Sequence, residues 1–330
     1  MQTTPSTTLF RDDDAVIGFH DHDHGHDHDH DHDHDHHHDH DHHHDHDHHH
    51  DHDHDHGHGH GHGRPKAKKP GILLAAFGAA VPGAREGYKI MGRETEERFP
   101  GVTVRWAFTA NKIRRKLAQR GLEHDSVAVA LSRLYDDGVT HLAVQSLHTV
   151  PGVEYHWTLD QSMVYQHPRK GFLKVGVGGA LLHGEEDLER AAGDLDGYIP
   201  SGLAADEAVV LVGHGTYHDG HQRYLDFQRQ IDAGRDNVFV GALMGRPNCA
   251  DVIETLKERG ARRVHLVPFM SVPGHHVQVD ICGEGERSWR GRMEAAGFEV
   301  VPHLTGTLEH KPFRTLWLDH LAEAMDGLNL

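Results

Sequence analysis

The sequence predicts an α/β protein of two similar lobes, each built on a parallel sheet, preceded by a disordered tail rich in His and Asp. Apolar runs of strand length alternate with helix-like segments from residue 71 onward, as in βαβ units. The order of these segments repeats in the second half of the chain. We therefore expect three parts: tail and basic linker at 1–70, an N-terminal lobe at 71–200 and a C-terminal lobe at 201–330.

The tail is defined by its histidines, since residues 20–62 hold 25 of the 40 in the chain. The first 63 residues also contain 17 Asp and one Arg, which gives −16 of the net charge of −18. With almost nothing apolar to bury, this segment cannot offset its chain entropy and is predicted to be disordered. Imidazole with carboxylate suits Co, Ni, Zn or Cu, so we expect the tail to buffer or deliver divalent metal. The alternatives are a low-complexity expansion or an engineered tag.

Composition excludes several classes of function. Residues 64–69 (RPKAKK) add +4, which leaves −6 for residues 70–330 and no basic stripe for nucleic acid. No run approaches the ~18 apolar residues of a membrane helix. Two cysteines, Cys249 and Cys282, are too few for a disulfide framework, and the N-terminus has no apolar signal region, so we expect a cytoplasmic protein. The sequence leaves open whether the protein forms a homo-oligomer.

The expected elements alternate through both lobes. In the first lobe we expect strands at 71–77, 102–108, 141–147 and 173–177, and helices at 82–98, after 110, at 126–137, 155–166 and 185–195. In the second we expect strands at 208–213, 237–243, 264–270 and 299–302, and helices at 218–232, 248–259, 284–296 and 311–325.

Two strand ends share a sequence motif. The runs 141–147 and 264–270 are each followed by Val-Pro-Gly and then by a polar residue two positions beyond the glycine. That residue is Glu154 in the first lobe and His276 in the second. A third strand runs into His214, between two glycines. Because ligands bind beyond the carboxyl ends of strands in open α/β sheets, we expect these polar groups to converge on one cleft.

Neighbouring histidines need separate interpretations. His275 and His276 are adjacent, so one is expected to face the cleft, and the internal alignment favours His276. Asp280 could orient that imidazole, or it could be a carboxylate at a helix N-terminus. His148 could be a site residue or a packed core residue. Histidines on expected helices are predicted to be solvated; these are His156, His218 and His221.

Two His and one Glu without Cys fit a divalent ion held loosely, with open coordination positions. The chain has no HExxH, CxxC, P-loop, GxGxxG or Gly-x-Ser-x-Gly motif, so hydrolase, kinase and nicotinamide-dependent activities and a bound nucleotide lack support. Two hypotheses remain from these residues. One is an enzyme that gives its metal away, and the other is a non-catalytic metal buffer or metallochaperone.

Several segments resemble the anaerobic, CbiK-type sirohydrochlorin cobaltochelatases of cobalamin biosynthesis. They include LLAAFG at 73–78, QSLH at 145–148 with GVEY at 152–155, GHG at 213–215, and VPGHH at 272–276 running on to Asp280. The resemblance covers residues 71–328. It implies two flavodoxin-like lobes of the class II chelatase type, with the active site between them. The implied activity is that of a lyase that inserts Co(II) into sirohydrochlorin without ATP, with Fe(II) or Ni(II) insertion as the alternative within the chelatases.

The resemblance also implies residue roles. The family's metal-binding and catalytic residues fall on His214, His276 and Glu154, which would hold Co(II) and accept the two pyrrole protons. The chain departs from the family at Gly274-His275-His276, where Gly-Asp-His is usual, and at Val279, where Asn is usual. Cations are expected at the cleft rim for the substrate carboxylates, and the candidates by location are Lys112, Arg114 and Arg115.

Overall fold

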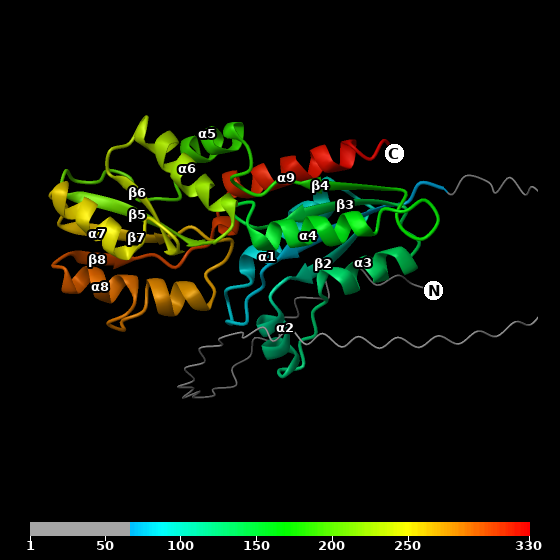
Figure 1. Cartoon of the computed structure of the whole chain (residues 1–330), viewed down its shortest axis with the longest axis horizontal. Helices are drawn as coiled ribbons and strands as arrows, with labels where there is room; N and C mark the ends of the chain where they lie inside the picture. Colours follow the sequence, from blue (N-terminus) through cyan, green and yellow to red (C-terminus); the bar gives the residue numbers. More distant parts are fainter. Residues whose placement is uncertain (1–66) are drawn as a thin grey trace, which may run out of the picture. The chain divides into compact units, whose positions relative to one another are not determined.

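The computed structural model describes residues 67–330, which belong to one compact unit. They contain two four-stranded parallel sheets, ordered β2-β1-β3-β4 and β6-β5-β7-β8 (Figure 1). The first sheet comprises β1 (Pro70–Ala76), β2 (Thr103–Phe108), β3 (His141–Ser146) and β4 (Lys174–Gly178). The second comprises β5 (Glu207–Gly215), β6 (Val238–Met244), β7 (Arg263–Pro268) and β8 (Glu299–Pro302). The predicted α/β class with two similar lobes is confirmed, and the predicted tail lies outside the described residues except for its last few positions.

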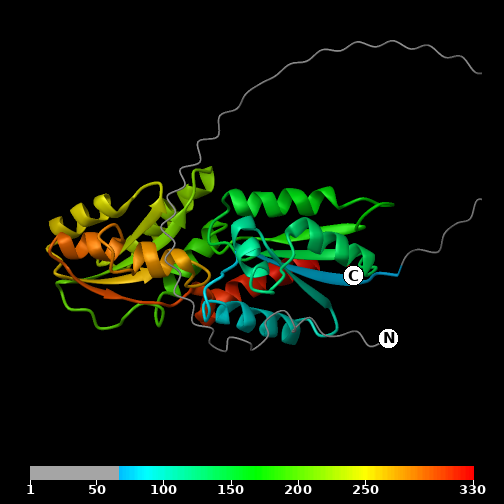
Figure 2. The same ribbon diagram turned by 90° about the horizontal axis from the view of Figure 1, so that it is seen from below.

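Helices lie on the faces of both sheets, as Figure 2 shows. They are α1 (Glu86–Arg98), α2 (Asn111–Ala118), α3 (Val127–Asp136), α4 (Val153–Val164), α5 (Glu185–Gly193), α6 (Gln222–Asp232), α7 (Cys249–Glu258), α8 (Trp289–Ala295) and α9 (Lys311–Asp326). Short helical turns occur at Asp219–His221, Val277–Ile281 and Thr307–Glu309. None of the helices within residues 67–330 is long and apolar enough to span a bilayer.

The central strands are continuous apolar runs because both of their faces are covered. In β1, Ile72 and Leu74 belong to one hydrophobic core, while Leu73 and Ala75 belong to another on the opposite face of the sheet. All four side chains are fully buried. Burying one large apolar side chain in this way stabilises the fold by roughly 1.5–3 kcal/mol. The apolar sequence of such a strand therefore places it at the centre of its lobe.

The two lobes repeat the same backbone hydrogen bonds at their central strands. The N–H of Leu147 donates to the carbonyl of Ala75 at 2.7 Å, and the N–H of Phe269 donates to that of Val212 at 2.7 Å. Counting forward from Ala75 and Val212 makes Phe77 the structural counterpart of His214.

The Val-Pro-Gly turns repeat as well. The N–H of Gly152 donates to Val150 at 2.8 Å, and the N–H of Gly274 donates to Val272 at 2.9 Å. This register makes Glu154 the counterpart of His276, as the sequence alignment predicted.

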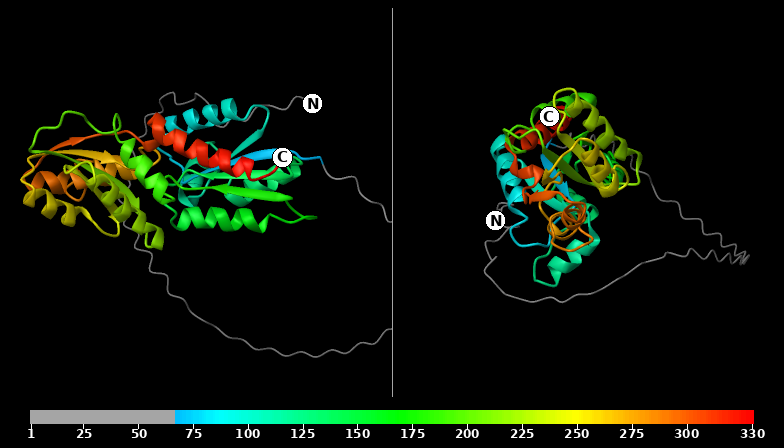
Figure 3. Two further views of the ribbon diagram at one scale, coloured as in Figure 1. Left: turned by 90° about the horizontal axis from the view of Figure 1, so that it is seen from above. Right: turned by 90° about the vertical axis from the view of Figure 1, so that its left-hand side faces the viewer.

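Two helices depart from a simple division between the lobes. The C-terminal helix α9 contacts β3 and β4 of the first sheet, along which it lies in Figures 1 and 3, while α5 contacts α6. Glycines in β4 allow this approach, since a Cβ at Gly176 would lie 2.6 Å from the carbonyl oxygen of Ala324. Residue 200 lies between the last strand of the first sheet and the first strand of the second, while α9 packs on the sheet that precedes it in the chain.

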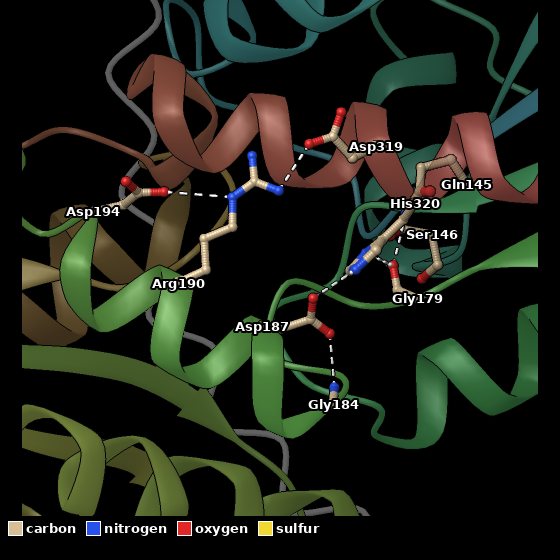
Figure 4. A network of polar contacts seen from close by, with 9 residues as sticks. All are labelled: Gln145, Ser146, Gly179, Gly184, Asp187, Arg190, Asp194, Asp319 and His320. Carbon is tan, nitrogen blue, oxygen red and sulfur yellow. Dashed lines mark hydrogen bonds and ion pairs between the residues drawn. The ribbon is translucent and has the colours of Figure 1, made fainter.

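Polar contacts fasten α9 in this position (Figure 4). His320 places Nδ1 3.1 Å from the carbonyl of Gly179 and Nε2 2.8 Å from a carboxylate oxygen of Asp187 on α5. One residue earlier, Asp319 accepts hydrogen bonds from Arg98 at 2.9 Å and from Arg190 at 2.8 Å. The last helix is thus joined to α1, to α5 and to the loop after β4.

Several predicted boundaries are shifted, most of all that of the helix before β8. The helix expected at 284–296 begins only at Trp289, because the hydroxyl of Ser288 caps it by accepting from the N–H of Gly291 at 2.9 Å. The helical turn Val277–Ile281, which has π-type hydrogen bonding, was not predicted. It begins directly after His276 and so helps to place that side chain.

Candidate functional site

His214 lies at the carboxyl end of β5, which continues to Gly215, two residues beyond the predicted end. Gly215 has φ of +78°, and a Cβ there would lie 1.8 Å from the carbonyl of Met244, so only glycine fits. His214 Nδ1 lies 3.0 Å from the carbonyl oxygen of Gly215. Because a carbonyl only accepts, Nδ1 carries the proton and Nε2 keeps a free lone pair.

His276 presents its imidazole in the same way. Its Nδ1 lies 2.7 Å from a carboxylate oxygen of Asp280, so Nδ1 donates and Nε2 keeps its lone pair. The predicted orienting contact from Asp280 is therefore confirmed. The rings of His214 and His276 face each other edge-on, with centroids 5.0 Å apart and planes at 70°. Two unprotonated imidazole nitrogens are thus available within one small volume.

Electrostatics favours the neutral form of His214. Burial lowers its pKa most strongly, the hydrogen bond to Gly215 partly opposes this, and the nearby His276 lowers the pKa further. The carboxylate of Glu154 acts in the opposite direction. A neutral imidazole near pH 7 is the form that binds a divalent ion.

Glu154 lies in the first turn of α4, half-buried and close enough to influence both His214 and Arg114. Within residues 67–330, however, no group of three or more His, Cys, Asp or Glu side chains is arranged to hold a metal ion. The structure brings His214 and His276 together, and Glu154 as a third ligand stays a prediction.

The two candidate arginines on α2 have different environments. Arg114 is half-buried and donates hydrogen bonds to the carbonyls of Phe108 and Thr109, the latter at 2.9 Å. Burial lowers its pKa, and Glu154 partly opposes that effect. Arg115 and Lys112 are exposed. Arg114 therefore holds the loop after β2, whereas Arg115 and Lys112 face solvent.

His148 is close to the site but differs from its counterpart. The second lobe has Met270 at the matching position. The carbonyl of His148, which follows β3, accepts from the N–H of Leu181, and the carbonyl of Met270, which follows β7, accepts from the N–H of Thr307 in the same way. His148 Nδ1 lies 2.7 Å from the hydroxyl of Ser146, and its buried Nε2 has no hydrogen-bond partner among the described residues. Burial, with a smaller effect of His214, lowers its pKa to about 4.

The prediction that His156, His218 and His221 are solvated is wrong. The ring of His156 on α4 stacks on that of His218 with centroids 4.4 Å apart, which links α4 to the segment after β5. His221 donates from Nε2 to the carbonyl of Arg246 at 2.6 Å. His275 is exposed, with its ring centroid 6.0 Å from that of His276, so only one of the adjacent pair faces His214.

Comparison with solved structures defines the class of fold. SirB from Bacillus subtilis with Fe3+ aligns with a TM-score of 0.54 at 14% identity, covering 78% of this chain and 95% of that chain. The sirohydrochlorin chelatase SirB from Bacillus subtilis subspecies spizizenii, in complex with cobalt, gives a TM-score of 0.53 at 12% identity, covering 78% and 96%. At this identity the likeness establishes the fold alone. It is the two-lobed fold of chelatases.

Sequence comparison then gives the family. The model of the cobalt chelatase (CbiK) family matches residues 70–326, and the chain belongs to that family. Sirohydrochlorin cobaltochelatase CbiKC of Nitratidesulfovibrio vulgaris (strain Hildenborough) is 39% identical over 265 residues, 80% of this chain and 93% of the relative. The sirohydrochlorin cobaltochelatase of Salmonella typhimurium (strain LT2) is 31% identical over 260 residues, 78% and 97% respectively.

Proposed function

We propose that the protein inserts Co(II) into sirohydrochlorin without a nucleotide and that His214 and His276 bind the metal for transfer. The observation that carries this proposal is the pair of imidazoles, whose centroids are 5.0 Å apart and whose Nε2 atoms both keep a lone pair. Membership of the cobalt chelatase family and the names of both curated relatives support the reaction and the metal. Two nitrogen ligands leave coordination positions open for water and for the incoming macrocycle.

The reaction exchanges one Co(II) for two pyrrole protons. A lone pair that holds the metal cannot accept a proton at the same time, so protonation of His214 or His276 follows the passage of Co(II) to the macrocycle. Each imidazole can then take one proton at Nε2. Glu154 favours the protonated form of His214, because its carboxylate raises the pKa of that imidazole. The two protons leave to water when the imidazoles return to the neutral form.

The substrate carboxylates require cations at the cleft. On α2, Arg115 and Lys112 are exposed, whereas Arg114 already donates to two backbone carbonyls. We therefore assign carboxylate binding to Arg115 and Lys112 before Arg114. A guanidinium can hold a carboxylate through two parallel hydrogen bonds, which also orients the macrocycle.

The His/Asp-rich segment is proposed as the metal supply. Its 25 histidines and interspersed aspartates offer many weak sites for divalent ions on the same chain as the site. Both cysteines are free and buried, which fits the reducing conditions of a cytoplasmic enzyme.

The test is anaerobic Co(II) insertion into sirohydrochlorin, followed by the visible spectrum, with free Co(II) fixed by a metal buffer. His214→Ala and His276→Ala are expected to abolish insertion. His275→Ala is the matched control, because it removes an adjacent but exposed imidazole, and it should retain activity. Wild-type rates in His214→Ala and His276→Ala would refute the residue assignment. Failure of the wild type with Co(II), Fe(II) and Ni(II) would refute the chelatase and favour a metal buffer.

A further inference from the structure

Phe77 lies directly after β1 and is the counterpart of His214, which lies at the carboxyl end of β5. Its ring faces that of His214, with centroids 6.2 Å apart and planes at 38°. The two lobes thus meet at this point through equivalent positions, one with a phenyl ring and the other with an imidazole.

This phenyl ring contributes to no hydrophobic core. The five residues before it, 72–76, are fully buried, but Phe77 is only half-buried. It belongs to none of the three hydrophobic clusters found in residues 67–330, either as a member or as a neighbour. An aromatic side chain that stabilises no core and lies beside a candidate ligand calls for a role in binding.

The local backbone fixes the turn that carries the ring. Gly78 has φ of +96°, a conformation that favours glycine, and a Cβ there would lie 2.8 Å from the ring of Phe108. The N–H of Ala110 also donates to the carbonyl of Phe77 at 3.2 Å. The ring is therefore carried by a defined turn, which is a condition for orienting a ligand.

Other large apolar side chains are exposed close in sequence to the polar residues of the site. Val153 is 58% exposed and precedes Glu154, while Tyr217, three residues after His214, is 86% exposed. Val279, three residues after His276, is 49% exposed. Each segment that supplies a polar site residue thus also presents an apolar group to solvent.

We propose that Phe77 is a substrate-orienting residue whose ring packs on one face of the tetrapyrrole and holds the macrocycle beside Nε2 of His214. This inference rests on the proposed function. A tetrapyrrole has a flat, conjugated centre and carboxylates at its rim. Cations such as Arg115 can fix the rim, but a ring facing the centre also fixes the tilt of the plane. Aromatic stacking supplies this contact without coordinating the metal.

The experiment uses the full-length protein with Phe77→Ala, Phe77→Leu and Phe77→Tyr. Binding of metal-free sirohydrochlorin is titrated by absorbance, and insertion is measured with free Co(II) fixed by a metal buffer. We expect Phe77→Ala to weaken tetrapyrrole binding and to raise the KM for sirohydrochlorin about tenfold. Phe77→Tyr should stay within about twofold of the wild type and Phe77→Leu should lie between them. The free Co(II) concentration for half-maximal rate should not change. Thermal unfolding controls for the fold.

Three outcomes would overturn the inference. If the wild type is active and Phe77→Ala binds the tetrapyrrole as tightly, the stacking contact is refuted while the proposed chelatase activity is retained. A higher half-saturating Co(II) concentration with unchanged tetrapyrrole affinity would instead make Phe77 a support for His214. A wild type that does not bind sirohydrochlorin would overturn the proposed function and this inference with it.

Discussion

Replacing Asp280 with Asn tests how His276 is prepared to bind metal. The carboxylate of Asp280 accepts the Nδ1 proton of His276 at 2.7 Å, which fixes the tautomer and makes Nε2 a better electron donor. Loss of such a partner weakens metal affinity by roughly 10- to 100-fold. The side chains of His276 and Asp280 are 43% and 46% exposed, so water screens the pair. We therefore expect the lower limit, about a tenfold higher free Co(II) concentration for half-maximal insertion.

The assay is Co(II) insertion in a metal buffer, which removes the contribution of the histidine-rich segment to total metal. Asp187→Asn is the matched control, since Asp187 on α5 accepts from His320 on α9 at 2.8 Å and contacts neither His214 nor His276. That variant should lose stability and keep the Co(II) dependence of the wild type. If Asp280→Asn also keeps it, the carboxylate does not tune the ligand, and our reasoning about Nε2 is wrong.

Three further predictions concern stability and substrate binding. His148 is neutral in the fold with its pKa lowered to about 4, whereas an unfolded histidine takes up a proton below about pH 6.5, so stability should fall on acidification. His148→Met introduces the residue found at the matching position of the second lobe. Between pH 7.5 and 5, the free energy of unfolding of this variant, measured in urea, should fall by about 2 kcal/mol less than that of the wild type. Arg115→Ala should raise the KM for sirohydrochlorin severalfold at unchanged Tm, whereas Arg114→Ala should lower the free energy of unfolding by about 1–3 kcal/mol, because two backbone carbonyls lose their donor. Gly215→Ala should destabilise the protein by at least about 2 kcal/mol in the same denaturation assay, because Gly215 has a positive φ and a Cβ there would lie 1.8 Å from the carbonyl oxygen of Met244. Wild-type stability of Arg114→Ala or of Gly215→Ala would contradict the contact described for that residue.

Much of the framework follows from local sequence. The strands could be predicted because apolar runs buried on both faces differ clearly from the segments around them, as in residues 72–76. The repeated Val-Pro-Gly turn was enough to align Glu154 with His276, and the hydrogen bonds after Val150 and Val272 have the same register.

Other features depend on contacts between distant segments. Periodicity indicates that α9 has an apolar face, but not that this face covers β3 and β4 of the other lobe. The stacking of His156 on His218 likewise depends on two elements that only the fold brings together. Phe77 matches His214 through the register of the backbone hydrogen bonds, and its ring lies outside every hydrophobic core of the described residues.

The asymmetry between the lobes has a chemical consequence. At matched positions the second lobe supplies His214 and His276, while the first supplies Phe77 and Glu154, so the duplicated fold offers two imidazoles rather than four. An enzyme that transfers its metal needs few protein ligands, because each additional nitrogen donor must be displaced before the macrocycle can take the ion. Phe77→His, which puts an imidazole in place of the phenyl ring whose centroid lies 6.2 Å from that of His214, should therefore lower the half-saturating free Co(II) concentration and slow single-turnover insertion at saturating tetrapyrrole. Insertion at the wild-type rate, despite tighter Co(II) binding, would contradict the argument that two imidazoles are kept for release.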